Sequence, residues 1–232
     1  MDYLLVGYGK MGRAIDDIAQ ARGHRRQGTL DTRKATPPVA DGPLVAFEFT
    51  DPRAARDNVL ALLEAGIHVV CGTTGWQPDA RVRQAAESGA VGAVLAPNLS
   101  VGVNLFYRAV RTASLTLLGS GLYEAYIVES HHRHKRDAPS GTALRLAEQV
   151  RDACPDVAPP PISSLRAGHE PGRHTVGFDG EFDTVELTHR ARSRGGFALG
   201  AVLAAEWLIG RQGIHDFEPV LEGLLEQGNG HA

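Results

Sequence analysis

A dense group of side chains that carry or exchange protons lies in the second half of the chain. The segment His131–Arg136 reads HHRHKR, and Asp137–Thr142, which follows at once, reads DAPSGT. Within it, Ser140 is a good N-cap directly after Pro139, so a helix is expected to begin there. Free N–H groups at a helix start attract anions, and histidine changes charge near neutral pH. The segment therefore predicts a site that holds a small carboxylate and moves protons around it.

The types of side chain suggest how the work is divided within this segment. A histidine and a lysine in a cationic cluster are both candidate proton donors. Gly141 and Thr142 would offer backbone N–H groups to a carboxylate, and Thr142 also a hydroxyl. If the strand expected at Tyr123–His131 continued, side chains would alternate, with His131 and Lys135 on one face and His132 on the other.

The cluster has two other interpretations. Histidines two apart on a strand face can bind a metal, but no further ligand follows at a metal-site spacing and the adjacent cations repel one, so no metal is expected. A charge run is usually a solvated surface. The abrupt change to DAPSGT makes a plain basic surface the less favoured interpretation.

A nucleotide-binding signature opens the chain. Leu4–Gly12 reads LLVGYGKMG, which is an apolar strand, a GxGxxG loop and the start of a helix. The three glycines suit a tight turn, a close approach of backbone to pyrophosphate, and close helix–strand packing. Asp31 follows Gly12 at the offset at which an acidic residue binds the adenosine ribose. The pattern predicts a dinucleotide site, with a ligand-free glycine turn as the alternative.

The type of dinucleotide stays open. Asp31 favours NAD, whereas the nearby Arg33 and Lys34 could meet the 2′-phosphate of NADP. Three further loops follow expected strands, at the edge where open α/β sheets bind ligands, and each could instead be an ordinary turn. These loops are Phe49-Thr50-Asp51-Pro52, Gly72-Thr73-Thr74-Gly75 and Ala96-Pro97-Asn98-Leu99-Ser100.

The alternation of strands and helices predicts the fold class. The first hundred residues alternate short apolar runs with amphipathic stretches, which is typical of a doubly wound parallel sheet. From Asn104 onward the pattern becomes mixed α+β, with Asp179-Gly180 as an expected hairpin turn. Expected strands are 3–7, 44–50, 67–71, 90–96, 123–131, 163–165, 174–178 and 184–189, and expected helices are 11–22, 54–64, 78–87, 140–151 and 197–209.

These patterns indicate an α/β protein of two domains. Residues 1–103 and 195–232 are expected to form a Rossmann-type dinucleotide-binding domain, to which the last apolar helix returns. Residues 104–194 are expected to form an α+β domain for substrate binding and oligomerisation, with a mixed, largely antiparallel sheet.

Composition narrows the class of protein. The chain has 232 residues, 43% of them hydrophobic and 22% charged, and a net charge of −3. A slightly acidic chain argues against general binding of nucleic acid or of a membrane surface. No signal peptide or membrane-spanning run is expected. Cys71 and Cys154 form no metal or disulfide pattern, which favours the reducing cytoplasm.

Taken together, these motifs resemble the 4-hydroxy-tetrahydrodipicolinate reductase family, also called dihydrodipicolinate reductases, of bacterial lysine biosynthesis. The segment Glu129–Ala143 (ESHHRHKRDAPSGTA) is highly specific to that family, and the resemblance runs over nearly the whole chain. Similar family patterns stand at 48–52 (EFTDP), 72–75 (GTTG), 98–104 (NLSVGVN), 166–168, 172–176 and 188–194. The compact nucleotide loop and the sequence at Asp31–Lys34 depart from many members.

The resemblance implies hydride transfer from NADH or NADPH to a cyclic dicarboxylate, with loss of water, in the diaminopimelate pathway. It implies that His131 and Lys135 donate protons and that His132, Gly141 and Thr142 bind substrate carboxylate. It also implies a homotetramer associated through the C-terminal sheet. The expected cofactor-binding residues are Gly7, Tyr8, Gly9, Lys10, Met11, Gly12, Asp31, Phe49, Thr50, Gly72, Thr73, Thr74, Ala96, Pro97, Asn98, Leu99 and Arg194.

Two alternative functions remain at the level of sequence. One is another dehydrogenase for a small substrate, such as an amino acid, on the same scaffold. The other is a redox sensor that binds NAD(H) without catalysis. The histidine-rich run with PSGT argues against both, because neither function requires it.

Overall fold

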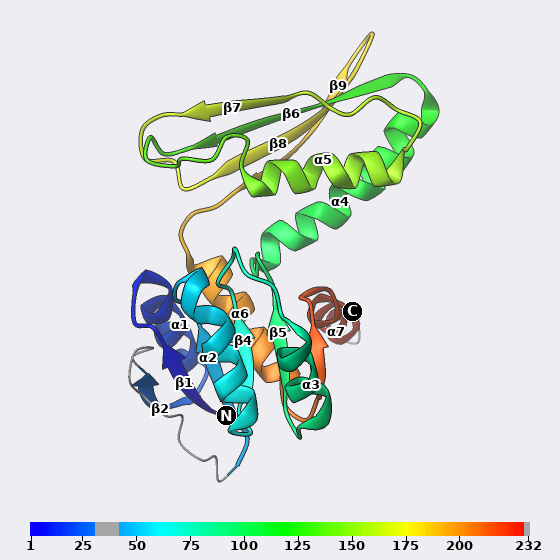
Figure 1. The fold of residues 1–232 in the computed structure, drawn as a ribbon. Helices are drawn as coiled ribbons and strands as arrows, with labels where there is room; N and C mark the ends of the chain where they lie inside the picture. The colour runs from blue at the N-terminus through cyan, green and yellow to red at the C-terminus, as the bar shows by residue number, and fades with distance from the viewer. Residues whose placement is uncertain (31–41, 230–232) are drawn as a thin grey trace. The chain divides into compact units, whose positions relative to one another are not determined.

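Short apolar runs in the first part of the chain form a parallel sheet (Figure 1). The computed structural model describes residues 1–30 and 42–229, and within them six strands pair in the order β10-β5-β4-β3-β1-β2. Strands β3 and β4 are buried along their whole length, as expected where helices cover both faces of a parallel sheet. The strands are β1 (Asp2–Val6), β2 (Arg25–Leu30), β3 (Leu44–Glu48), β4 (His68–Cys71), β5 (Gly92–Leu95) and β10 (Gly213–His215).

Two apolar cores lie on opposite faces of this sheet. One packs α1 (Lys10–Ala21), α6 (Gly195–Leu208) and α7 (Glu218–Asn229) against it, and the other packs α2 (Pro52–Glu64) and α3 (Ala80–Ser88). Helices α2 and α3 begin at side-chain caps, since Asp51 and Asp79 each accept a backbone N–H of the first turn. This arrangement confirms the predicted doubly wound, Rossmann-type fold.

A second sheet belongs to the second half of the chain. Strand β6 (Tyr123–His131) pairs in parallel with β7 (Ile162–Arg166) and antiparallel with β8 (Arg173–Gly180), which pairs antiparallel with β9 (Thr184–Arg190). The predicted mixed, largely antiparallel sheet is therefore confirmed. Its core packs against α4 (Val101–Leu117) and α5 (Gly141–Ala153), with the short helix η1 (Leu118–Ser120) after α4.

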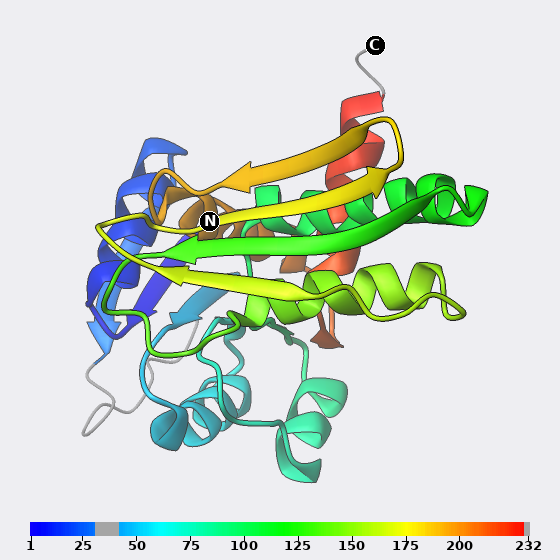
Figure 2. The ribbon, with the colours of Figure 1, turned by 90° about the horizontal axis from the view of Figure 1, so that it is seen from above.

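The two helices of this half lie on the same side of the sheet, and Figure 2 shows the four strands side by side from its other face. Tyr126, Val128 and Ser130 alternate with the buried side chains of β6, so they lie on that other face. Val128 and Leu165 are exposed there, and the Thr175 and Thr188 hydroxyls bond each other at 2.9 Å. This sheet face is called the open face below.

The chain divides into two compact units. Unit 1 comprises Met1–Val101 and Arg194–Ala232, and unit 2 comprises Gly102–Ser193. The boundaries expected from sequence, after 103 and after 194, fall close to these. Helix α6 belongs to unit 1 and is rich in small residues: a Cβ at Gly200 would lie 1.7 Å from the Leu99 carbonyl oxygen, so only glycine permits this close packing.

Several predicted elements need correction. Strand β2, helix α4, strand β10 and helix α7 were not predicted. The hairpin between β8 and β9 does not turn at Asp179-Gly180, because both residues lie within β8 and Asp179 pairs with Thr184. Its turn comes later, where the Gly180 N–H donates to the Asp183 carbonyl at 2.9 Å. Strand β6 ends at His131, so alternation does not extend to Lys135.

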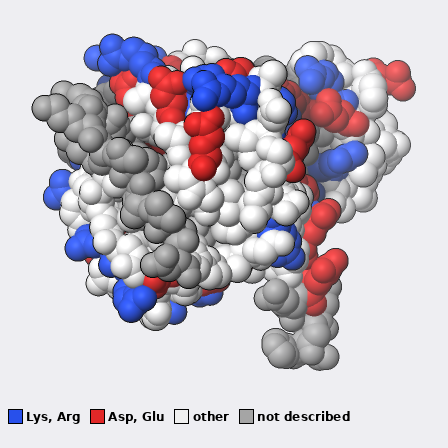
Figure 3. Space-filling model, turned by 60° about the horizontal axis from the view of Figure 1, so that its bottom comes forward, with Lys and Arg blue, Asp and Glu red and all other residues white. Residues whose placement is uncertain are grey.

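The surface carries charges of both signs. On the face shown in Figure 3, Lys and Arg side chains lie beside Asp and Glu side chains among uncharged ones. Exposed pairs such as Arg56–Asp79 and Arg81–Glu64 are of the kind that contributes little to stability. Across the described ranges, no helix has the length and apolar character needed to cross a membrane.

Candidate active site

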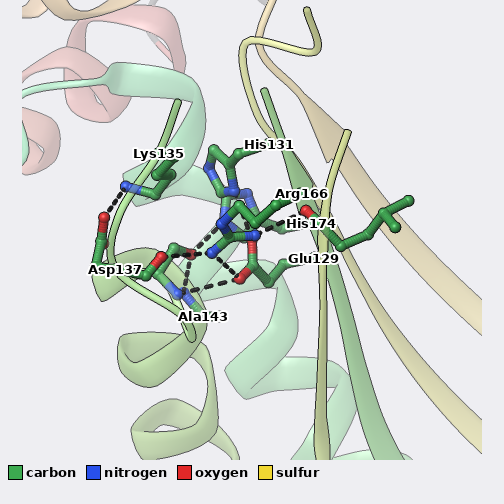
Figure 4. A network of polar contacts seen from close by, with 9 residues as sticks. Glu129, His131, Lys135, Asp137, Ala143, Arg166 and His174 are labelled. Atoms are coloured by element: carbon green, nitrogen blue, oxygen red, sulfur yellow. Dashed lines mark hydrogen bonds and ion pairs between the residues drawn. The ribbon is translucent and has the colours of Figure 1, made fainter. Parts of the chain in front are cut away.

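The end of strand β6 brings a carboxylate and an imidazole together. Glu129 and His131 are two residues apart, so both point to the face of the sheet that α4 and α5 cover. The register then adds two neighbours, because Glu129 pairs with His174 on β8 and His131 pairs with Arg166 on β7. A strand ladder thus places four ionisable side chains in one group (Figure 4).

Glu129 is the centre of this group and is fully buried. Arg166 donates a hydrogen bond to each carboxylate oxygen of Glu129, with Nη2 2.6 Å from Oε1 and Nη1 3.0 Å from Oε2. The Ser140 N–H donates to Oε1 at 3.2 Å, and His131 Nδ1 lies 2.5 Å from Oε2. Burial opposes ionisation of Glu129, but the hydrogen bonds from Arg166, Ser164 and His131 outweigh it and lower its pKa to about 2. Glu129 is therefore an anion that can only accept.

An ionised Glu129 fixes the tautomer of His131. Because Oε2 accepts, Nδ1 must carry a hydrogen, and Nε2 is left as the atom that takes up or gives away a proton. Burial lowers the pKa of His131; the Glu129 carboxylate raises it, and the charges of Lys135 and Arg166 lower it further. The balance is a pKa below the ordinary value, so a bound anion would be needed to favour the protonated ring at neutral pH.

His174 packs behind His131. The two rings meet edge to face with centroids 5.0 Å apart, and the Ser140 hydroxyl lies 3.0 Å from His174 Nε2. The same hydroxyl caps helix α5 by accepting the Ala143 N–H at 3.2 Å. Burial lowers the pKa of His174 to about 4, with the charge of His131 as the next cause. Ser140 therefore joins the helix start to the histidine pair.

The buried, neutral His174 predicts a dependence of stability on pH. A histidine whose pKa is lower in the folded state stabilises the fold above its unfolded pKa of about 6.5 and loses that contribution as the pH falls toward about 4. The free energy of unfolding is expected to fall by up to about 3 kcal/mol across this window. Urea unfolding of unit 2 between pH 7 and 4 measures it. His174→Phe should flatten the slope, and an unchanged slope would contradict this assignment.

Lys135 and His132 follow β6 in a turn rather than a strand. Lys135 Nζ lies 2.9 Å from Asp137 Oδ1, and the Lys135 N–H donates to the His132 carbonyl. The His132 backbone N–H donates to the Glu170 carbonyl at 2.8 Å, whereas its buried Nδ1 has no partner within the described structure. A buried imidazole nitrogen without a partner suits the binding of a polar ligand.

The same group offers a geometric metal site, since ligand atoms of Glu129, His131 and His174 lie within 4.8 Å of one another. Its chemistry fits a metal poorly. The Arg166 guanidinium holds both oxygens of Glu129, and a cation between them would have to displace it. The three side chains are better described as a proton-holding network.

The nucleotide loop lies in unit 1 between β1 and α1. Gly7 has φ +89°, and a Cβ there would lie 2.9 Å from the Phe49 carbonyl oxygen. A Cβ at Gly12 would lie 2.4 Å from the Gly7 oxygen, whereas the space around Gly9 is open to 4 Å. Gly7 and Gly12 thus permit the tight turn, and Gly9 leaves backbone open to a ligand. These three positions fit a dinucleotide pyrophosphate.

The other cofactor candidates have diverse environments. The Tyr8 hydroxyl donates to the buried Asp16 at 2.9 Å, Lys10 is exposed, and Met11 packs on the core. Asp31 lies outside the described residues. The loops after β3 and β4 meet, because the Thr50 N–H donates to the Thr73 hydroxyl at 2.9 Å and a Cβ at Gly72 would clash with the Phe49 ring.

The third loop is more deeply packed. Ala96 and Leu99 are core side chains, so only their backbone can face a ligand, whereas Pro97 and Thr74 are exposed. Arg194 is exposed at the N-cap of α6, where its carbonyl accepts two first-turn N–H groups. In unit 2, Gly141 and Thr142 begin α5, as predicted, so their N–H groups have no partner within the helix.

Sequence reasoning missed the roles of four residues in this network: Glu129, Ser140 as a partner of His174, Arg166 and His174. One signal was present, because Glu129 precedes His131 by two and must share its face of a strand. Arg166 and His174 come from β7 and β8, and only the register between strands brings them to this place.

A Rossmann-type unit and a second unit with a buried network of proton-holding side chains define a pyridine-nucleotide-dependent oxidoreductase. Residues 1–99 match the family of dihydrodipicolinate reductase, N-terminus, and residues 102–221 match dihydrodipicolinate reductase, C-terminus. The chain therefore belongs to the dihydrodipicolinate reductase family.

Individual relatives agree with this assignment. The chain is 37% identical to a 4-hydroxy-tetrahydrodipicolinate reductase of Christiangramia forsetii, over 97% of this chain and 100% of that one. It is 40% identical to the enzyme of the same name from Archaeoglobus fulgidus, over 94% of this chain and 84% of that one. A dipicolinate-bound dihydrodipicolinate reductase from Paenisporosarcina sp. TG-14 has the same fold, with a TM-score of 0.75 at 20% identity, covering 93% of this chain and 97% of that one.

Proposed function

We propose that this protein reduces 4-hydroxy-tetrahydrodipicolinate to tetrahydrodipicolinate with NADH or NADPH and releases water, in the diaminopimelate route to lysine. The observation that carries the proposal is the Glu129–His131 pair beside the capped start of α5, within the segment most specific to the family. One hydride and one proton enter the ring and one water leaves it. The bound nicotinamide supplies the hydride.

The residues of unit 2 would share the remaining work. Thr142, Gly141 and His132 hold a substrate carboxylate, the first two through the N–H groups at the start of α5 and the third through its unpaired ring nitrogen. His131 Nε2 and Lys135 Nζ are the proton donors. A dianionic substrate favours the protonated form of His131, since its charge adds to that of Glu129 and offsets the charges of Lys135 and Arg166.

Family membership favours this reaction over the two alternatives. A sensor that binds NAD(H) without catalysis has no need of a tautomer-fixed histidine, and oxidation of an amino acid does not require the HHRHK–PSGT segment. For the cofactor, Gly7, Gly9 and Gly12 would receive the pyrophosphate and Asp31 the ribose. The other residues proposed to line the dinucleotide are Tyr8, Lys10, Met11, Phe49, Thr50, Gly72, Thr73, Thr74, Ala96, Pro97, Asn98, Leu99 and Arg194.

We further propose that the protein acts in the cytoplasm as a homotetramer. The open face of the unit 2 sheet supports this assembly, because none of the helices described in unit 2 covers it and it exposes the apolar side chains of Val128 and Leu165. Light scattering of the purified protein measures the mass. Leu165→Glu is expected to reduce it, and a monomeric parent protein would refute the proposal.

Oxidation of NADH and NADPH is the first test. The substrate is made in situ from pyruvate and aspartate semialdehyde by the preceding synthase, and absorbance of the reduced nicotinamide is followed. Rapid oxidation is expected, with NADH preferred because the Asp31 carboxylate repels a 2′-phosphate unless Arg33 or Lys34 compensates. Arg33→Ala should then reduce any use of NADPH.

Two results would contradict this view. Tight binding of NADH without turnover would refute the reductase and favour the sensor. A many-fold preference for NADPH that Arg33→Ala leaves unchanged would instead refute only the proposed ribose site.

A further inference from the structure

The structure assigns to the Glu48 side chain a role that the sequence patterns leave open: it is a positioning residue that holds two cofactor loops of unit 1 in one arrangement. These loops are Phe49–Asp51 after β3 and Gly72–Gly75 after β4. The inference rests on the proposed function in so far as these loops bind the dinucleotide. It concerns a separate residue, in a different unit from the proton donors.

Glu48 ends strand β3 and is fully buried. Its Oε1 accepts from the Thr50 hydroxyl and from Asn58 Nδ2, the latter at 3.1 Å. Its Oε2 accepts from Cys71 Sγ at 3.1 Å and from the Thr73 hydroxyl at 2.6 Å. One carboxylate therefore joins the ends of two neighbouring strands, both loops and helix α2.

The partners of Glu48 differ from those of Glu129. Every hydrogen bond described for this carboxylate comes from a neutral group, whereas Glu129 is held by Arg166. Burial and the adjacent Glu48 raise the pKa of the Cys71 thiol, so this partner is a protonated donor. Because all four donors are neutral, Glu48 forms no ion pair with a described residue that would account for an acidic side chain in this buried position. Its hydrogen bonds to both loops do account for it.

The loop contact depends on the direction of one hydroxyl. Because Thr73 Oγ1 gives its only hydrogen to Glu48, its lone pairs remain to accept the Thr50 N–H at 2.9 Å. Glu48 thus sets the link between the two loops without reaching the ligand itself. Without the Glu48 carboxylate the Thr73 hydroxyl is free to rotate, and the hydrogen bond from the Thr50 N–H that joins the two loops is weakened.

Substitution of Glu48 by glutamine tests the inference. Glutamine keeps the shape but turns an N–H₂ group toward donors, so two of the four hydrogen bonds are lost. The Kd for NADH, measured by fluorescence titration, is expected to rise about tenfold, while the KM for the cyclic dicarboxylate changes little. If Glu48 only stabilised the fold, the substitution would lower the melting temperature without raising the Kd for NADH more than the KM for the cyclic dicarboxylate.

His68→Gln is the matched control. His68 is also buried and polar, and it accepts the Gly92 N–H at 3.1 Å, but it stands at the opposite end of β4 from the loops. Its replacement should lower the melting temperature and leave the Kd for NADH unchanged. An equal rise of this Kd in both variants would overturn the inference.

A second pair of variants tests the same link if Glu48→Gln does not fold. Thr73→Val removes the hydroxyl and Thr73→Ser keeps it, so only the former should weaken NADH binding, by about fivefold. Where Glu48→Gln does fold, adding Thr73→Val to it should change the Kd for NADH almost no further, and full additivity would overturn the inference. If the parent protein binds no NADH, the proposed function and this inference both fail. If it binds NADH normally and neither substitution alters the Kd, only the inference fails.

Discussion

Replacing His131 with glutamine is expected to lower kcat by about 10²–10⁴-fold, because the reaction then lacks a positioned proton donor. Lys135→Ala should cause a comparable loss, because its ammonium group is the second proposed proton donor. The Kd for NADH should stay within about twofold, since both side chains belong to unit 2 and the nucleotide loop to unit 1. Steady-state kinetics and NADH fluorescence measure the two quantities.

His134→Gln is the control for this pair. His134 lies in the same turn but is exposed, and its ring centroid lies 6.2 Å from that of His132. Its loss should reduce kcat only slightly, although it removes an imidazole from the same basic segment. Near-normal rates for both His131→Gln and Lys135→Ala would show that neither residue is the acid.

The four inner strands of the unit 1 sheet, β5, β4, β3 and β1, could be predicted because their residues are largely apolar. Runs such as Leu44–Glu48 are largely apolar, and parallel strands buried on both faces require this. Strand β2 reads RRQGTL and is largely exposed, so its sequence offered neither an apolar run nor alternation. It is an edge strand that β1 holds in place, and that pairing is a tertiary effect.

Helix α4 was missed for a different reason. Its sequence, VGVNLFYRAVRTASLTL, has residues of low helix propensity (Val, Gly, Asn, Thr and Ser) spread along its whole length. In the structure the hydroxyls of Thr112, Ser114 and Thr116 each donate to the carbonyl four residues earlier, which gives these polar groups a partner inside the helix. Packing of Phe106 and Val110 in the core of unit 2 then outweighs propensity.

In the candidate site, too, some features follow from local sequence and others from tertiary pairing. The cap at Ser140 and the turn of Gly7 follow from local rules and were found. The partners Arg166 and His174 come from strands far along the chain, and only the pairing of β6 with β7 and β8 places them beside Glu129. A local motif can therefore name a candidate proton donor, but the groups that set the proton affinity of that residue depend on strand register.

Glu129→Gln is expected to show this dependence directly. The Glu129 carboxylate raises the pKa of His131, whereas burial, Lys135 and Arg166 lower it. Removing the carboxylate therefore lowers the pKa of His131 further and leaves Arg166 without its anion. Because His131 must be protonated to donate, kcat/KM falls as the pH rises through this pKa, and the descending limb should move to lower pH. For each pH unit that the limb moves, kcat/KM at pH 7 should fall about tenfold.

The pH profile separates this effect from damage to the fold. Glutamine in place of Glu129 also disturbs a buried ion pair, so a lower melting temperature is expected in any case. Glu124→Gln on the same strand is the matched control, because Glu124 is exposed and its loss should leave both the profile and the melting temperature unchanged. A folded Glu129→Gln variant whose descending limb stays at the parent pH would show that Glu129 stabilises unit 2 without tuning His131. A descending limb that moves to lower pH, with the Kd for NADH unchanged, would show that Glu129 sets the pKa of His131. The pairing of β6 with β7 and β8 would then determine the proton affinity of the donor.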